Sequence, residues 1–339
     1  MQTWEKTFSI APGSSVNIDQ HRGKIEVTGW EQPEIKVIAT TQDEEPIDER
    51  LEVAVRERSL ILEVRRRARS FFGLFRPAEP PIDLVINLPV GTACVIDTGA
   101  GPVSVTGTRA ALKIDSGSGD VVVADVASCH VDTGSGDVEV QGVAGAADID
   151  TGSGAVLVRQ VGGSASVDTG SGDVTISQVS GGLKVDTGSG DVTMADVEGN
   201  VEVDTGSGAI ALARVKGPKL HLDTGNGAIR GGNLAVDSLH VDTGSGSVDL
   251  ELVAINLQGR YLVDTGSGEV TLTLPADAGL TLELDTNSGR IQHDGLAVEV
   301  THMERGELAG TLNGGGARLK VDTGSGDIRL VTARGTTRE

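Results

Sequence analysis

Apolar and polar residues alternate along most of the chain, around a recurring Asp-Thr-Gly-Ser segment or a close variant of it. Counting from the aspartate of each copy, the preceding residue is Ile, Val or Leu, and the residues three before and six after it are apolar. A period of two on both sides of the segment is typical of β-strands, whereas a helix repeats every three or four residues. Each copy therefore predicts a strand, a glycine-rich corner and a second strand.

The segment occurs in twelve copies, which indicates a repeat architecture. Successive aspartates are 17 to 22 residues apart, and a final interval of 37 residues is interpreted as two periods with one degenerate copy between them. A single unit cannot bury its apolar side, whereas stacked units bury one another. We predict an all-β, single-stranded parallel β-solenoid, a right-handed β-helix with rungs of about 18 residues. Its aspartates are Asp97, Asp115, Asp132, Asp150, Asp168, Asp186, Asp204, Asp223, Asp242, Asp264, Asp285 and Asp322.

The chain divides into three predicted regions. Residues 1–93 are expected to form an irregular β cap or enlarged first coil, although residues 16–27, VNIDQHRGKIEV, fit the repeat with Asp19 in the aspartate position. Residues 94–331 are expected to form the solenoid, and residues 332–339 a flexible tail. Cys94 and Cys129 occupy one repeat position two rungs apart, about 9.5 Å at the usual strand spacing. That separation exceeds the disulfide limit of roughly 7 Å, which predicts free, buried thiols.

The corner residues have structural explanations. Glycine four residues after each aspartate can adopt the positive φ that a sharp bend requires. Threonine one residue after the aspartate is expected to point inward and to form a hydroxyl ladder. The aspartate is expected to accept backbone hydrogen bonds as an Asx turn. This structural ladder is assigned to Asp132, Asp150, Asp168, Asp186, Asp204, Asp242 and Asp264.

The sequence argues against catalysis, although residues 186–189 match the segment around an aspartic protease's catalytic residue. Such a protease needs two aspartates, one from each half of a cleft, that share a proton. A stack of equivalent aspartates offers no such cleft. No catalytic residue is therefore assigned, and the chain is predicted not to be an enzyme.

Cation binding is the main alternative to a purely structural ladder. Six corners carry a second acid directly after the glycine, and Asp137, Asp173 and Asp191 are the candidates for cation binding. Calcium-binding solenoid repeats instead place aspartate two residues after glycine. Backbone donors are therefore expected to relieve most of the repulsion, with calcium as the alternative and no other cofactor or metal assigned. His221 and His240 share a repeat position, where a solvated polar face is preferred over a zinc site.

Charge restricts the partners. The chain has a net charge of −21, and residues 81–339 account for −19 of it. Such a surface repels nucleic-acid phosphates and attracts cations or basic partners. The sequence shows no apolar run long enough to span a bilayer and no secretory signal, so a cytoplasmic location is expected, with peripheral membrane contact as an option.

One basic and aromatic segment interrupts this composition. Residues 65–77, RRRARSFFGLFRP, are interpreted as part of a cap over the first rung. Contact with another copy of the chain and contact with an anionic membrane are the alternatives. The residues assigned to such a contact are Arg65, Arg66, Arg67, Arg69, Phe71, Phe72 and Phe75.

Three stretches resemble a known family. They are GKIEVTGW near the start, the tandem VDTGSGDV units, and LAGTLNGGGARLKVDTGSGDIRL near the end. Together they resemble the bacterial putative-adhesin β-solenoid family, a domain of unknown function, over nearly the whole chain. The resemblance implies a β-solenoid and supplies no catalytic residues. We predict a non-enzymatic scaffold that self-assembles head to tail through an uncovered last rung, with an adhesin-type binding module that uses an acidic face as the alternative.

Overall fold

The chain folds almost entirely into β-strands, as the sequence predicts. The computed structural model describes residues 1–11, 13–56, 58–65 and 79–333. These residues contain 31 strands and one short helix, α1 (Ile47–Arg50). Most of the basic and aromatic segment, including Arg66, Phe71 and Phe75, lies outside the described residues. The chain divides into two compact units, Met1–Gly163 and Ser164–Glu339.

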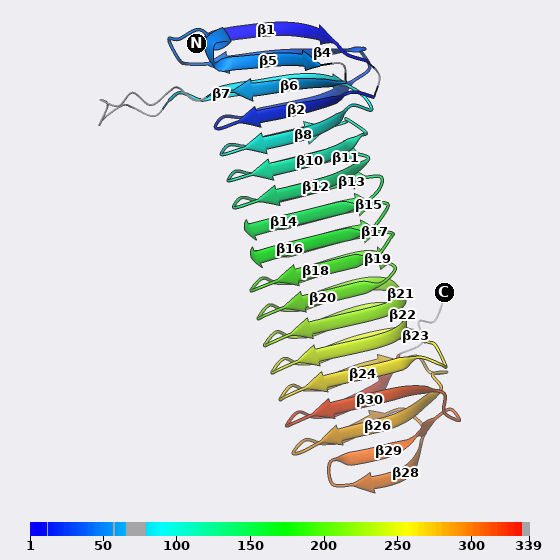
Figure 1. Cartoon of the computed structure of the whole chain (residues 1–339). Helices are drawn as coiled ribbons and strands as arrows, with labels where there is room; N and C mark the ends of the chain where they lie inside the picture. Colours follow the sequence, from blue (N-terminus) through cyan, green and yellow to red (C-terminus); the bar gives the residue numbers. More distant parts are fainter. Residues whose placement is uncertain (12, 57, 66–78, 334–339) are drawn as a thin grey trace, which may run out of the picture. The chain divides into compact units, whose positions relative to one another are not determined.

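The first unit contains two series of hydrogen-bonded strands, one on each side of the corners (Figure 1). The first series runs, in spatial order, β5 (Leu51–Arg56), β6 (Ser59–Val64), β2 (Ser15–Gln20), β8 (Ala93–Thr98), β10 (Ala111–Ser116), β12 (Ser128–Thr133) and β14 (Ala147–Ser153). The second runs β1 (Gln2–Ser9), β4 (Glu34–Thr41), β7 (Ile82–Pro89), β3 (Ile25–Trp30), β9 (Val103–Thr106), β11 (Val121–Val126), β13 (Val138–Val143) and β15 (Val156–Val161).

The second unit repeats this arrangement. Its first series runs β16 (Ala165–Ser171), β18 (Leu183–Thr187), β20 (Val201–Thr205), β21 (Ile210–Thr224), β22 (Ile229–Thr243), β24 (Arg260–Thr265), β30 (Ala317–Thr323), β26 (Leu280–Thr286), β29 (Glu307–Leu312) and β28 (Val298–Glu304). Its second series runs β17 (Val174–Val179), β19 (Val192–Glu198), the first halves of β21 and β22, then β23 (Val248–Ile255), β25 (Val270–Leu274), β31 (Ile328–Thr332) and β27 (Ile291–Asp294).

The register explains how so few bulky residues form a core. Parallel strands one repeat apart align equivalent positions, for example Ile114 with Val131 and Val203 with Leu222. Side chains on alternate positions are fully buried, and the corner threonines join them at 0 to 2% exposure. The predicted inward position of threonine is therefore confirmed. Cys94 and Cys129 are free and buried, on either side of Leu112 in the register.

The corner glycines follow the predicted explanation in the first unit only. There Gly101, Gly119, Gly136 and Gly154 have φ between +124° and +136°. In the second unit the equivalent glycines lie outside the positive-φ region, so the prediction is wrong for them. Close backbone approach explains these positions instead, because a Cβ atom at Gly227 would lie 1.7 Å from the carbonyl oxygen of Gly208.

The strand order at the end of the second unit differs from the chain order. Strand β30, which carries Asp322, lies between β24 and β26, so the rung of Asp322 is inserted before that of Asp285 (Figure 1). The prediction of a degenerate repeat between Asp285 and Asp322 is wrong, because the residues between them include the antiparallel strands β28 and β29. Strand β29 pairs with β26 and places Leu308 and Leu312 in the core. The prediction of an uncovered last rung is wrong for its first strand, β26, which this pair of strands covers.

The beginning of the first unit has a similar order. Strand β2 lies between β6 and β8, and β3 lies between β7 and β9, so that Asp19 aligns with Asp97. Antiparallel β5 then pairs with β6, and antiparallel β4 with β7. Both regions thus reverse strand direction at their outer strands, where the repeat pattern of the sequence stops.

Candidate functional site

Columns of aspartate run along both units. The register stacks Asp19, Asp97, Asp115, Asp132 and Asp150 in the first unit. In the second unit it stacks Asp168, Asp186, Asp204, Asp223, Asp242, Asp264, Asp322 and Asp285. Apart from half-buried Asp223, Asp322 and Asp285, these residues are exposed. The structural ladder predicted from the sequence therefore forms an acidic surface on each unit.

The electrostatics of the columns are unfavourable. Partial burial, and secondarily the charges of Asp223 and Asp186, raise the pKa of Asp204 above its ordinary value. The same causes raise the pKa of Asp97, beside Asp19 and Asp115, and the pKa of Asp264, beside Asp322 and Asp242. Like charges one strand spacing apart repel each other even in water, by about 1 kcal/mol per pair. These carboxylates therefore favour binding of positive charge.

The corner hydrogen bonds are made by threonine. In the second unit Thr205 Oγ1 accepts a bond from the Gly208 amide at 3.1 Å and donates to the Gly190 carbonyl at 3.1 Å. The same pair of bonds recurs at Thr224, Thr243, Thr265, Thr286 and Thr323. At these corners a threonine thus makes the turn bond that the sequence analysis assigned to the aspartate.

The second acid of the corner accepts a backbone bond from the next repeat. The Ala155 amide donates to Asp137 Oδ1 at 2.8 Å, and the Asp191 amide donates to Asp173 Oδ1 at 3.0 Å. The Ala209 amide likewise donates to Asp191 Oδ1 at 2.8 Å. One carboxylate oxygen of each residue is thus engaged by the protein. Cation binding at these three aspartates stays a prediction.

Two histidines meet where the repeat predicts. His221 aligns with His240 in the register, and their ring centroids are 4.6 Å apart in an edge-to-face arrangement. The Nδ1 atom of His221 is buried and has no hydrogen-bond partner among the described residues. The two imidazoles contact each other across neighbouring strands, and among the described residues they form no metal-ligand group with the carboxylates of Asp223 and Asp242.

Arg65 is the one residue of the predicted assembly contact that the structure describes. Its guanidinium pairs with Glu52 and lines a hollow of about 430 Å³ with Trp4 and Phe8. The Trp4 indole donates to the Asp48 carboxylate, and Lys6 Nζ lies 4.9 Å from the centroid of the Trp4 ring. Arg66, Arg67, Arg69, Phe71, Phe72 and Phe75 lie outside the described residues, so their role stays a prediction.

One group of potential ligands does not follow from the repeat pattern. His302 and Glu304 on β28 and Glu307 on β29 bring one nitrogen and two carboxylate oxygens within 4.8 Å of one another. The group lies at an antiparallel turn outside the repeat columns. The sequence His302-x-Glu304-x-x-Glu307, with Gly306 before the last acid, is a signal that could have identified it.

Neutralising one column aspartate tests the electrostatic description. Between the ordinary pKa of 3.8 and the higher folded value of Asp204, the folded chain binds more protons than the unfolded chain. Its free energy of unfolding therefore falls as pH rises through this window. We expect Asp204→Asn to stabilise the protein at about pH 7 and to have little effect at about pH 3, as urea titrations at both pH values would show.

Asp196→Asn is the matched control for this prediction. A hydrogen bond from Arg214 holds the pKa of Asp196 below its ordinary value, so neutralising it should destabilise the protein at neutral pH. Added salt should reduce the part of the Asp204 effect that comes from neighbouring charges. A destabilising effect of Asp204→Asn at neutral pH would contradict the description.

Comparisons with known proteins give a family and several solved structures. The sequence profile of the Toastrack DUF4097 family matches residues 87–180 and 177–331. No curated protein matches the sequence. A solved putative cell adhesion protein from Clostridium sporogenes has 12% identity and a TM-score of 0.22, over 98% of this chain and 100% of its own.

Two further solved structures are a putative adhesin from Bacteroides fragilis and one from Parabacteroides merdae. The first has 12% identity and a TM-score of 0.27, over 97% of this chain and 97% of its own. The second has the same identity and TM-score over 80% of this chain and 92% of its own. In the part of the chain that the structure describes, no helix is long and apolar enough to cross a membrane.

Proposed function

The chain belongs to the Toastrack DUF4097 family, and we propose that it is a non-catalytic, adhesin-type module whose aspartate columns bind a positively charged partner. The observation that carries this proposal is the register, which aligns one exposed or half-buried carboxylate per repeat along each unit. A column of fixed negative charges raises the local concentration of cationic ligands and accelerates their association. A basic segment of another protein is the partner that this chemistry fits.

The repeated geometry argues against catalysis. General acid and base residues need environments that separate their pKa values. Here the column aspartates have similar surroundings, and the pKa shifts of Asp97, Asp204 and Asp264 share one direction and one set of causes. Repetition of equal sites is better suited to binding an extended partner than to a chemical step.

We also propose that each unit is a right-handed β-solenoid with rungs of about 18 residues. The parallel register between equivalent repeat positions supports this arrangement. Right-handed connection is the general rule for parallel strands joined by a crossover. Such a coil would keep the column straight, so that several carboxylates face one partner together.

A decalysine peptide tests the binding proposal. We expect the full chain to bind the peptide in calorimetry, with an affinity that falls steeply as NaCl increases. The variant Asp186→Asn/Asp204→Asn/Asp223→Asn should bind at least about tenfold more weakly. The control Glu198→Gln/Asp249→Asn/Glu251→Gln removes equal charge from β19 and β23, in the second series of strands, and should change affinity by less than about twofold. Equal losses in both variants would reject the column as the site.

Self-association is the second candidate, and the exposed strand β28 favours it. β28 pairs with β29 on one side, and its Val300 and Met303 are 44% and 65% exposed. An edge strand with exposed apolar residues can pair with another chain. The association would then use a strand edge in place of the uncovered rung predicted from the sequence. Sedimentation of the purified chain without peptide separates this candidate from the binding module, which stays monomeric.

A further inference from the structure

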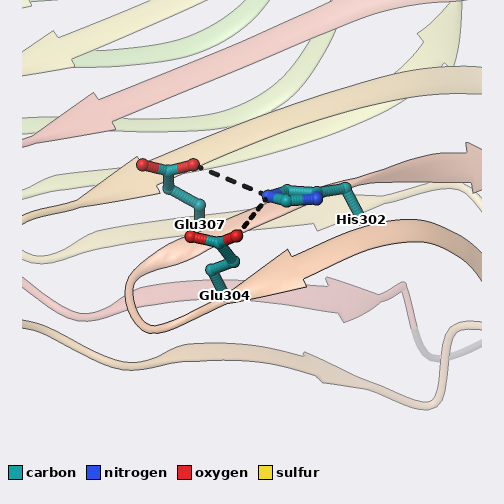
Figure 2. A group of neighbouring side chains, drawn as sticks. All are labelled: His302, Glu304 and Glu307. Carbon is teal, nitrogen blue, oxygen red and sulfur yellow. Dashed lines mark ion pairs between the residues drawn. The ribbon is translucent and has the colours of Figure 1, made fainter.

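The turn between β28 and β29 gathers three metal-ligand atoms outside the aspartate columns. Figure 2 shows the carboxylates of Glu304 and Glu307 directed at the ring of His302. His302 Nε2 lies 3.8 Å from Glu304 Oε1 and 3.8 Å from Glu307 Oε2. The three side chains are 51%, 69% and 55% exposed, so an ion could reach them from solvent.

The local sequence builds this group directly. His302 and Glu304 are two residues apart on one strand, which places both on the same side. The antiparallel register sets Glu304 opposite Glu307, across a turn in which Gly306 has a φ of +86°. A register shift between Val300 and His302 changes the pairing at the histidine. Such irregularities redirect side chains and are frequent beside functional sites.

The cross-strand glutamates make the turn unfavourable without a positive charge. Like charges directly opposite each other destabilise an antiparallel pair. His302 Nε2 lies beside both carboxylates. A metal ion held by this nitrogen and the two carboxylate oxygens would supply the positive charge that the pair of glutamates lacks.

We propose that His302, Glu304 and Glu307 form a zinc site. Zn²⁺ is held by imidazole nitrogen at about 2.0–2.1 Å and by carboxylate oxygen at about 2.0–2.2 Å, and tetrahedral ligands around it are about 3.4 Å apart. The two nitrogen–oxygen separations are 3.8 Å and the oxygen–oxygen separation is within 4.8 Å, so the three ligand atoms need to move closer together to hold the ion. Calcium and magnesium prefer oxygen ligands alone, so the histidine nitrogen selects against them.

Three protein ligands leave one zinc position open. In tetrahedral zinc sites with three protein ligands, water or another molecule takes the fourth position. The ion would link β28 to β29 at the turn and fix the edge strand. The site is independent of the binding proposed for the aspartate columns, because it uses none of their residues.

Calorimetry with ZnCl₂ on the full chain tests the proposal. We expect one zinc ion per chain at this site, and His302→Ala should weaken its binding by about tenfold or more. Glu304→Gln/Glu307→Gln should have a similar effect, and a tenfold excess of calcium or magnesium should not displace zinc. All three side chains are exposed, so circular dichroism should show an unchanged fold in these variants.

Two controls use the other histidines of the same unit. His293→Ala alters a residue on β27 and should leave zinc binding unchanged. His221→Ala/His240→Ala removes the stacked pair, the rival zinc position, and should also leave it unchanged. Loss of binding in this double variant with retention in His302→Ala would overturn the proposal, as would absence of zinc binding by the unaltered chain.

Discussion

Gly227→Ala is expected to lower the free energy of unfolding by at least about 3 kcal/mol. The added Cβ would lie 1.7 Å from the carbonyl oxygen of Gly208 and 2.5 Å from its carbonyl carbon. Both contacts are with backbone in the neighbouring rung, so no side-chain rotation can relieve them. The rungs would have to separate locally, which would lengthen the bonds between Thr224 and Gly208 and between Gly227 and Thr224.

Gly232→Ala is the matched control, since it is also a Gly→Ala substitution and lies only five residues further along the chain, on β22. The nearest atom to its added Cβ is a glutamate oxygen of Glu251 at 3.6 Å, an ordinary contact. This change should be neutral or stabilising by up to about 1 kcal/mol, through reduced freedom of the unfolded chain. Urea denaturation of the two variants measures the difference. Equal stabilities would show that close rung spacing does not require glycine at position 227.

Leu312→Ala is expected to destabilise the end of the second unit by about 2 to 4 kcal/mol. Leu312 is 1% exposed and lies opposite Leu280 in the pairing of β29 with β26. Truncating it leaves a cavity beneath the antiparallel strands that cover the last rung. If that rung were uncovered, as the sequence alone suggested, the same substitution would have little effect.

Hydrogen exchange combined with urea denaturation measures this effect. Repeat proteins can lose end units before the rest unfolds, so the amides of β26 and β29 should lose protection first. Thr311→Ala changes the neighbouring, half-buried residue on the other side of β29 and should cost less than about 1 kcal/mol. Unchanged protection of β26 in Leu312→Ala would show that the core does not depend on this cover.

The repeated part of the fold follows from the sequence because each repeat position has one environment. Apolar residues before and after the corner are buried in successive rungs, and the corner threonines are buried with them. The same alignment predicted the neighbouring positions of Cys94, Leu112 and Cys129, and of His221 and His240. Periodicity constrains such positions strongly, because a shift by one residue would expose every buried side chain.

The rung order near Asp285 and Asp322 could not be read from periodicity. Both aspartates carry the same local pattern, so the sequence does not show that β30 pairs with β24 and β26 on its two sides. The alternation of β28 and β29 resembles that of a degenerate repeat, because antiparallel and parallel strands share a period of two. Only the direction of strand pairing distinguishes a rung, whose strands pair in parallel, from the antiparallel strands that cover β26.

Site residues were predictable to the same extent as the repeats. The aspartate columns follow from periodicity, whereas the choice between Asp and Thr as the corner acceptor depends on which side-chain oxygen faces the glycine amide of that corner. The group of His302, Glu304 and Glu307 depends on antiparallel pairing across Gly306. Its ligands come from a turn that no repeat template contains.

The inserted rung means that this end of the protein cannot be completed in the order in which the ribosome releases it. Residues 280–312 emerge before residues 317–332, yet β30 and β31 lie between them and the preceding strands β24 and β25. The antiparallel strands β26, β29 and β28 are close in sequence and can pair without the later segment. Strands β30 and β31, which are synthesised later, then join this small sheet to the preceding rungs.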